Sequence, residues 1–352
     1  MRILAVTNMY PTDAAPWAGT FVEQQIASLR RSGVTVDLLF VDRLGRGLRA
    51  YWGLAAEVRR RVRKIRPDLV HVMYGGWMSD VVTRALRDVP VVVSFCGSDL
   101  LGQREGGWIR RVAARYGVLA SGWAALRAVA VIVKSESLRR ALPSGLDPAR
   151  VWLIPNGIDL DRFRPLDPAR CREKLGWDPR MRHVLFPASP DNRVKRFPLA
   201  AAAVERLRQE GMPIEIHALR GVPHSEVPVW LNAADCLLLT SEHEGSPNIV
   251  KEALACNRPV VSVDVGDVRQ RLAGVSGCVV SAADPGSLAS SLAGALAASP
   301  SEGRPTGRSA VGELSLEVIA ARVLGVYVAV REAFGASNGE AANRANRSGA
   351  IA

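Results

Sequence analysis

The chain has 352 residues, of which 48% are hydrophobic and 23% charged, so it is long enough for two globular domains with substantial cores. Its 46 Lys and Arg residues against 34 Asp and Glu residues give a net charge of +12, which favours anionic partners such as phosphorylated substrates or anionic lipid. The five cysteines form no CxxC pair, so neither a disulfide framework nor a zinc site is indicated, and no metal site is expected; a reduced, cytoplasmic chain is the simplest interpretation.

Strand patterns alternate with helical patterns through the first half of the chain. An apolar strand at Arg2–Thr7 is followed by a loop and then by an amphipathic helix at Phe21–Arg31. Further strands are expected at Val34–Val41, Asp68–Met73, Pro90–Phe95, Val129–Val133 and Val151–Ile154. Units of this kind build a doubly wound parallel sheet, in which ligands bind at the carboxyl ends of the strands.

Three loops at those strand ends carry candidate contacts. They are Gly19 and Thr20 after the first strand, Tyr74 and Gly75 after the third, and Cys96 and Asp99 after the fourth. Gly19 either lets the backbone approach a diphosphate or forms a plain turn. Asp99 either accepts a hydrogen bond from an acceptor hydroxyl or caps the next turn, and Cys96 is interpreted as a small packing residue.

Two segments of the first half combine basic and apolar residues. Arg59–Arg66 crowds basic side chains onto a helix that buries one stripe, and Arg110–Trp123 places aromatic residues among arginines. A solvated basic face is the simpler explanation, and attachment to an anionic membrane surface is the sharper one. No segment is apolar over the length of a bilayer span, and Met1–Thr7 is too short for a signal peptide.

The second half repeats the alternation. Strands are expected at His183–Pro187, Ile214–Leu219, Cys236–Leu239, Pro259–Val263 and Gly277–Val280. Arg193 and Lys195 lie at the loop–helix junction after the first of these strands, where a diphosphate needs positive charge. The segment Arg220–His224 follows the strand Ile214–Leu219 and is interpreted as bordering the base of a nucleotide. The pair Asp159 and Asp161 follows Asn-Gly in a connecting segment and is interpreted as linker, not as a metal site.

The most informative stretch is Thr240–Asp267, TSEHEGSPNIVKEALACNRPVVSVDVGD. A buried strand leads into a polar loop, and Pro247 is then expected as the first residue of a helix. The helix start predicts an anion site suited to phosphate. Its free backbone N–H groups are those of Asn248, Ile249 and Val250.

Two carboxylates flank this predicted phosphate site. Glu244 precedes the helix and Glu252 follows eight residues later. Both cannot bind the phosphate, because like charges repel, so they suit hydroxyl groups on either side of a diphosphate unless they are ordinary surface glutamates. The pair and its flanks, EGSPNIVKEALACNRPVV, resemble the signature of family 4 (group 1) glycosyltransferases, which are retaining enzymes of the GT-B fold.

The resemblance implies roles for individual residues. Glu244 would lie at the donor sugar, Glu252 would bind the ribose, and Lys195 with Arg193 would bind the donor phosphates. The residues expected to hold the diphosphate are Ser246, Pro247, Asn248 and Ile249. This chain departs from the family pattern at Cys96, where a histidine is usual, and lacks the usual Gly-Arg before Arg193.

We therefore expect an α/β protein of the GT-B fold with two doubly wound, Rossmann-like domains facing across a cleft. The expected parts are an acceptor-side domain (1–164), a donor domain (165–312), a helix that crosses back to the first domain (313–335) and a disordered tail (336–352). The resemblance implies a metal-independent, retaining, hexosyl-type transfer from a UDP- or GDP-type sugar, with no other cofactor.

The implied acceptor is a carbohydrate or lipid-linked hydroxyl in polysaccharide, lipopolysaccharide or glycolipid synthesis, and no nucleic acid partner is expected. The protein would be cytoplasmic, or peripheral on the inner face of the membrane. Three alternatives to this function remain. A nucleotide-sugar 2-epimerase shares the fold but needs more acid–base groups, and a glycogen-type phosphorylase needs a pyridoxal lysine and a much longer chain. A non-catalytic nucleotide-sugar-binding subunit would explain the missing histidine.

Overall fold

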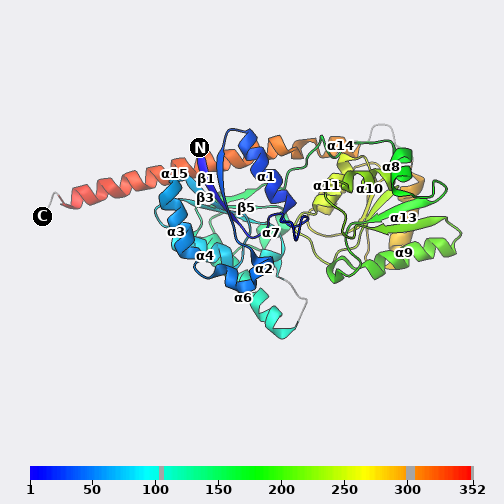
Figure 1. Cartoon of the computed structure of the whole chain (residues 1–352), viewed down its shortest axis with the longest axis horizontal. Coiled ribbons are helices and arrows are strands. Elements are labelled where there is room, and N and C mark those ends of the chain that lie inside the picture. The colour runs from blue at the N-terminus through cyan, green and yellow to red at the C-terminus, as the bar shows by residue number, and fades with distance from the viewer. Residues whose placement is uncertain (103–106, 299–305, 350–352) are drawn as a thin grey trace. The chain divides into compact units, whose positions relative to one another are not determined.

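The computed structural model describes residues 1–102, 107–298 and 306–349, and the chain divides into two compact units (Figure 1). The first unit contains Met1–Thr12, Ala18–Pro155 and the chain from Glu317 onward. The second contains Asp13–Trp17 and Asn156–Leu316. Each unit is built around one parallel sheet, as the alternating strand and helix patterns predict.

The sheet of the first unit has the strand order β2-β1-β3-β4-β5-β6, and every pairing in it is parallel. Its strands are β1 (Arg2–Thr7), β2 (Thr35–Phe40), β3 (Leu69–Val72), β4 (Val91–Phe95), β5 (Ala130–Val133) and β6 (Val151–Leu153). All residues of β3, β4 and β5 are buried, because helices cover both faces of a parallel sheet and select continuous Val, Ile and Leu runs.

The helices of this unit form two layers. They are α1 (Thr20–Arg31), α2 (Arg43–Arg46), α3 (Leu54–Ile65), α4 (Trp77–Ala85), α5 (Ser98–Leu101), α6 (Trp108–Arg127), α7 (Glu136–Arg140) and α15 (Leu316–Gly349), with 3₁₀ turns η1 (Gly47–Tyr51) and η2 (Pro148–Arg150). Helices α3, α4 and α6 pack side by side. Since crossovers are right-handed, α1 lies on the opposite face. Helix α15 is anchored to the sheet by Tyr327, whose hydroxyl lies 2.6 Å from Nδ1 of His71.

The sheet of the second unit has the order β11-β10-β9-β7-β8 and is also parallel. Its strands are β7 (Arg182–Phe186), β8 (Ile214–Ala218), β9 (Cys236–Leu239), β10 (Val260–Val263) and β11 (Val279–Ser281). Strand β8 pairs on one side of β7 and β9 on the other, so the order in which strands are added to the sheet reverses between β7 and β9. In doubly wound sheets this switch point is where ligands bind, outside the carboxyl ends of the strands.

The helices of the second unit cover both faces of that sheet. They are α8 (Pro168–Leu175), α9 (Phe197–Gln209), α10 (Val227–Ala233), α11 (Asn248–Ala255), α12 (Val268–Leu272), α13 (Pro285–Ala297) and α14 (Gly307–Ala310), with 3₁₀ turns η3 (Arg193–Lys195) and η4 (Gly312–Leu314). Helix α9 packs against α13, α8 against α10, and α11 against α14.

Two predicted boundaries differ from the structure. The change of unit falls after Pro155, not after residue 164, because the connecting segment bonds to the second unit: the N–H of Ile158 donates to the carbonyl of Leu314 at 2.8 Å. The tail from Ala336, which the sequence predicts to be disordered, is a continuation of α15 through Gly349. Among the described helices none has the length and apolarity needed to cross a bilayer.

Candidate active site

The loops that follow β7 and β9 meet at the switch point of the second unit. The N–H of Glu242 donates to the carbonyl of Val194 at 2.8 Å, and Oγ1 of Thr240 donates to the carbonyl of Lys195 at 2.7 Å. These bonds hold the two loops together and bring Nζ of Lys195 into an ion pair with Oε1 of Glu244, both half-buried. Two residues that the sequence predicts at the donor are therefore neighbours, although 49 positions separate them.

The basic residues of the β7 loop divide into two groups. Arg196 has a left-handed backbone conformation (φ 52°), and its guanidinium donates to the carbonyls of Thr240 at 2.6 Å and Ser241 at 3.1 Å. Arg196 is thus used to join the loops. Arg193 is exposed at the start of η3, with no ion pair in the part of the chain that the structure describes. Lys195 and Arg193 remain as the side chains that can meet an anionic ligand.

The start of α11 differs by one residue from the prediction. Pro247 is the N-cap and Asn248 is the first helical residue. The N–H of Val250 is not free, because it donates to the carbonyl of Pro247 at 3.3 Å. Within the described residues, the N–H groups of Asn248 and Ile249 have no hydrogen-bond partner. The predicted anion site is therefore narrower, with two backbone donors instead of three.

A buried lysine lies in the first turn of the same helix. Lys251 is fully buried, and its Nζ lies 3.3 Å from Oδ1 of Asn248 and 3.4 Å from the carbonyl of Asn156. No acidic residue occupies the first turn of α11. A helix start carries partial positive charge, and the ammonium group of Lys251 adds to it.

Glu252 is buried and is oriented by a histidine from another loop. Its Oε1 lies 2.9 Å from Nε2 of His224, and the His224 ring packs against Phe163 with centroids 5.3 Å apart. An ordinary surface glutamate would be exposed, so the functional interpretation of Glu252 gains support. The sequence predicts that His224 borders the base of the donor nucleotide. In the structure, the His224 ring contacts the carboxylate of Glu252.

The hydroxyl of Ser246 is committed to the protein. Its Oγ donates to Oδ2 of Asp267 at 2.9 Å, and the same carboxylate oxygen accepts from Nε of Arg271 at 3.0 Å. This bond ties the β9 loop to the loop after β10. The predicted contact of Ser246 with a diphosphate would therefore use its backbone and not its side chain.

Gly266 allows the β10 loop to approach the β9 loop closely. Its φ is +58°, and a Cβ built on it would lie 2.7 Å from the carbonyl oxygen of Gly245 and 3.2 Å from that of Glu244. Only glycine fits here without moving the loop that carries Glu244. Gly266 is thus a positioning residue for that carboxylate.

In the first unit, Asp99 organises the loops after β3 and β4. Its carboxylate accepts from the backbone N–H groups of Gly75 at 2.9 Å, Cys96 at 3.0 Å and Gly97 at 2.7 Å. Burial raises the pKa of Asp99, and these backbone donors oppose that rise. The contacts support a structural, capping-type role, and the role at an acceptor hydroxyl stays a prediction.

The other predicted acceptor-side residues lie around Asp99. Burial raises the pKa of the Cys96 thiol to about 12, so it is neutral at physiological pH, and the hydroxyl of Tyr74 lies 2.8 Å from Oγ of Ser98. Lys134, after β5, was not anticipated from the sequence. It is buried, and its Nζ has no hydrogen-bond partner among the described residues. Burial lowers the pKa of this amine.

The backbone at Gly19 has a conformation and a close contact that favour glycine. Its φ is +70°, and a Cβ would lie 2.2 Å from the carbonyl carbon of Met9. Thr20 is the first residue of α1. Both belong to the first unit, so their contact with a diphosphate stays a prediction.

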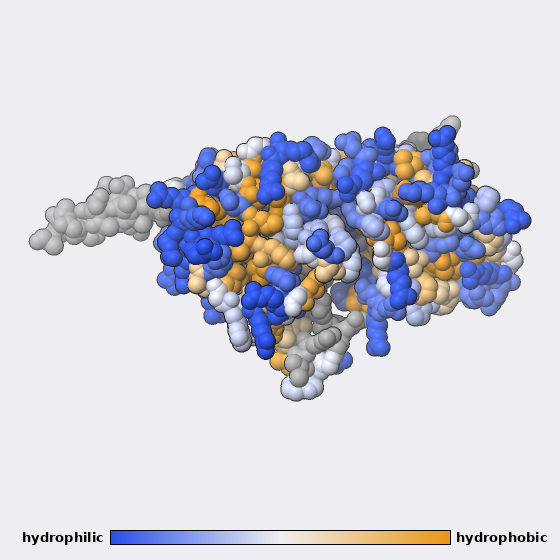
Figure 2. Space-filling model, in the orientation of Figure 1, coloured by the Kyte–Doolittle hydropathy of each residue, from blue (hydrophilic) through white to orange (hydrophobic). Residues whose placement is uncertain are grey.

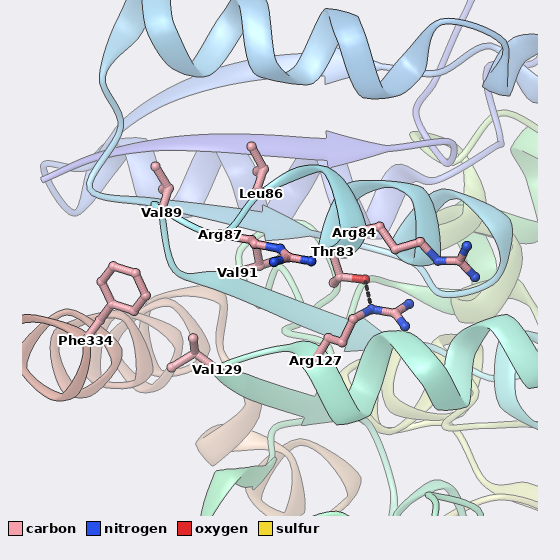
Figure 3. A pocket seen from close by; sticks show the side chains of 9 residues that line it. All are labelled: Thr83, Arg84, Leu86, Arg87, Val89, Val91, Arg127, Val129 and Phe334. Carbon is pink, nitrogen blue, oxygen red and sulfur yellow. Dashed lines mark hydrogen bonds between the residues drawn. The ribbon is translucent and has the colours of Figure 1, made fainter. Parts of the chain in front are cut away.

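A cavity of about 530 Å³ in the first unit is a poor candidate for the site (Figure 3). It is lined by residues that include Val91 and Val129, at the amino ends of β4 and β5, which is the opposite edge from the ligand-binding edge. Two of its arginines, Arg84 and Arg127, pair with the carboxylate of Asp80.

Two family models match the chain. Residues 18–162 match Glycosyltransferase Family 4, and residues 185–298 match Glycosyl transferases group 1. Together with the two parallel-sheet units, these matches define the class: the chain belongs to the family 4 (group 1) glycosyltransferases of the GT-B fold.

Several curated proteins are similar in sequence. D-inositol 3-phosphate glycosyltransferase 2 of Catenulispora acidiphila is 31% identical over 186 residues, which are 43% of this chain and 44% of that protein. The D-inositol 3-phosphate glycosyltransferase of Frankia alni is 31% identical over 180 residues, 42% of this chain and 44% of that protein. The chain thus spans less than half the length of these two relatives. The putative teichuronic acid biosynthesis glycosyltransferase TuaC of Bacillus subtilis is 25% identical over 332 residues, 76% of this chain and 82% of that protein.

Solved structures confirm the fold. Sucrose-phosphate synthase from Thermosynechococcus elongatus has a TM-score of 0.74 at 18% identity, and the match covers 96% of this chain and 100% of that chain. The Anabaena protein HepE in complex with UDP has a TM-score of 0.66 at 16% identity, covering 94% and 100%. WaaG, a glycosyltransferase involved in lipopolysaccharide biosynthesis, has a TM-score of 0.60 at 16% identity, covering 95% and 98%.

Proposed function

We propose that the protein is a retaining glycosyltransferase that moves a hexosyl group from a nucleoside diphosphate sugar to an acceptor hydroxyl. The observation that carries the proposal is the start of α11. Among the described residues, the backbone N–H groups of Asn248 and Ile249 have no hydrogen-bond partner there, and the first turn of α11 contains no acidic residue. Lys195 lies on the adjoining loop with Glu244 beside it.

The proposed donor is bound along this surface. The diphosphate would contact the N–H groups of Asn248 and Ile249, together with Lys195 and Arg193. Glu244 would accept a hydrogen bond from a sugar hydroxyl when the phosphates draw Lys195 toward them. Glu252, held by His224, would accept from the ribose hydroxyls.

The chemistry follows from where charge develops. In the transition state the bond from the sugar to the diphosphate breaks, so negative charge grows on the leaving phosphate and positive charge on the sugar ring. Lys195 and the start of α11 stabilise the negative charge on the leaving phosphate, and Glu244 stabilises the positive charge on the sugar ring. The acceptor oxygen bonds to the sugar on the same face, and its proton passes to the leaving phosphate oxygen. This route needs no histidine at the position of Cys96.

We propose that no divalent metal is needed at the diphosphate, because the helix start and the two cationic side chains supply the positive charge. A uridine diphosphate donor is the first candidate, since HepE, a protein of the same fold, was solved in complex with UDP and with UDP-glucose. A GDP-type donor is the alternative.

We propose a carbohydrate or lipid-linked acceptor that meets the loops after β3 and β4, and a place on the inner, anionic face of a membrane. Hydrophilic side chains gather over α3 (Figure 2), where Arg59, Arg63 and Lys64 are exposed. Helix α6 adds an exposed apolar stripe. Its residues are Trp108, Val112, Tyr116, Leu119 and Trp123. Basic side chains beside exposed aromatic residues are typical of interfacial surfaces.

The test is a screen of nucleotide sugars by thermal stabilisation of the purified full-length protein, followed by product analysis with the sugar that stabilises most. We expect a nucleoside diphosphate sugar to raise Tm and to be turned over with retention of the anomeric configuration. Isomerised donor as the product would identify a 2-epimerase. Tight binding with no transfer to any hydroxyl acceptor, water included, would identify a binding subunit.

A further inference from the structure

A cluster of metal-ligating side chains lies in the second unit, on β7 and β8, apart from the proposed donor site. His183 on β7 is paired in register with Glu215 on β8, and His217 lies two residues further along β8 on the same face. One ligand atom from each residue lies within 4.8 Å of the other two. His183 is the second residue of β7, so about 10 Å of strand separates the cluster from the carboxyl end.

The separations between the three ligand atoms fit a tetrahedral zinc site. Nδ1 of His183 lies 3.0 Å from Nε2 of His217, and Oε2 of Glu215 lies 3.9 Å from the former and 3.5 Å from the latter. Zinc bonds of about 2.0–2.2 Å at tetrahedral angles place neighbouring ligand atoms roughly 3.3–3.5 Å apart. The three side chains would need to move by only a few tenths of an ångström.

Hydrogen bonding sets the tautomer of His183. Its Nε2 lies 2.8 Å from the carbonyl oxygen of Asp178, which can only accept, so Nε2 carries the proton and Nδ1 presents a lone pair. A carbonyl that orients a histidine in this way is the usual outer-sphere partner of a metal ligand. The carboxylate of Glu215 faces the same lone pair, an arrangement that a cation between them would make favourable.

Aromatic rings enclose the cluster on one side. Trp177 stacks on His217 with ring centroids 3.7 Å apart, and Trp230 packs edge-on against Trp177 at 5.6 Å. His183 is fully buried, whereas the side chain of Glu215 is 42% exposed. The cluster is therefore rigid on the protein side and open to solvent on the other, which leaves a path for an ion and a fourth position for water.

We propose that His183, His217 and Glu215 form a structural binding site for a zinc-type divalent cation that fastens the edge strand β8 to β7. Two imidazoles and one carboxylate suit zinc, whereas magnesium and calcium prefer oxygen ligands. On binding, the ion replaces the proton shared between the two rings. His217 then carries its proton on Nδ1, so both imidazoles stay neutral and no net proton is released.

The test uses the full-length protein after dialysis against a chelator and removal of the chelator. Zinc and magnesium are titrated by calorimetry, and cobalt is added as a spectroscopic probe. We expect one zinc per chain, a rise in Tm with zinc only, and the visible absorption of tetrahedral cobalt. The variants Glu215→Gln and His217→Gln are expected to lose at least about tenfold in zinc affinity.

Glu205→Gln on α9 is the matched control, because it removes an exposed carboxylate of the same unit that belongs to no ligand group among the described residues. It is expected to bind zinc as the unmodified protein does. The proposal is overturned if the unmodified protein binds no zinc, if magnesium binds as well as zinc, or if all four proteins bind zinc equally. The readouts do not depend on transferase activity.

Discussion

Replacing Gly266 by alanine should damage the donor site through its backbone support. The new Cβ would lie 2.7 Å from the carbonyl oxygen of Gly245, and an ordinary carbon–oxygen contact is about 3.3 Å, so the loop must move by about 0.6 Å. The carbonyl of Glu244, at 3.2 Å, moves with it. A misplacement of 1 Å at a reacting site can cost about a hundredfold in rate, so we expect roughly a tenfold loss in kcat/KM for the donor.

Gly274→Ala is the matched control for this change. Gly274 also has a positive φ, +75°, but a Cβ there would meet nothing within 4 Å. Both variants pay the steric penalty of a left-handed alanine, about 1–2 kcal/mol, and both should therefore show a lower Tm. Donor kinetics are compared at a temperature where both proteins are folded. Equal kcat/KM in Gly266→Ala and Gly274→Ala would refute the argument that Gly266 positions Glu244.

Three further predictions follow from the same site and surface. His224→Ala should weaken nucleoside diphosphate binding by about tenfold, because Glu252 loses its charge-assisted partner, and His224→Gln should recover part of the loss; calorimetry with UDP and GDP checks this. EDTA should leave the initial transfer rate unchanged, even if it lowers Tm by removing a metal ion from the cluster of His183, Glu215 and His217. A loss of rate that magnesium or manganese restores would contradict the prediction that the diphosphate needs no metal. Arg59, Arg60 and Arg63 changed together to Glu should abolish salt-sensitive co-sedimentation with anionic liposomes, since each basic residue contributes about 1 kcal/mol; equal sedimentation of both proteins would remove the membrane role.

The strands could be predicted from the sequence to within about two residues because the runs are continuous and apolar. Cys236–Leu239 reads as a buried strand in isolation, and β9 has those bounds. The start of α11 is harder, because the φ of Pro247 (−68°) fits both the N-cap and the first helical position, and its ψ of 115°, which is extended, cannot be predicted from the sequence.

The contacts between distant loops could not be predicted. Glu252 and His224 lie 28 residues apart, and nothing in either local pattern indicates that they meet. Lys251 stands inside the recognised motif, yet its importance depends on burial against Asn156, which the linear pattern does not contain. His183 and His217 are separated by 34 residues and become neighbours only through the register of β7 and β8.

The central claim, that Lys195 and the start of α11 hold the donor diphosphate, is tested most directly by calorimetric titration of UDP and GDP into Lys195→Ala. Lys174→Ala on α8 is the control, because it removes the same charge from an exposed position of the same unit. Loss of a charge-assisted bond of about 1.5–3 kcal/mol predicts affinity lower by about 10–100-fold in Lys195→Ala and unchanged in Lys174→Ala. Equal affinity in both variants would contradict the account.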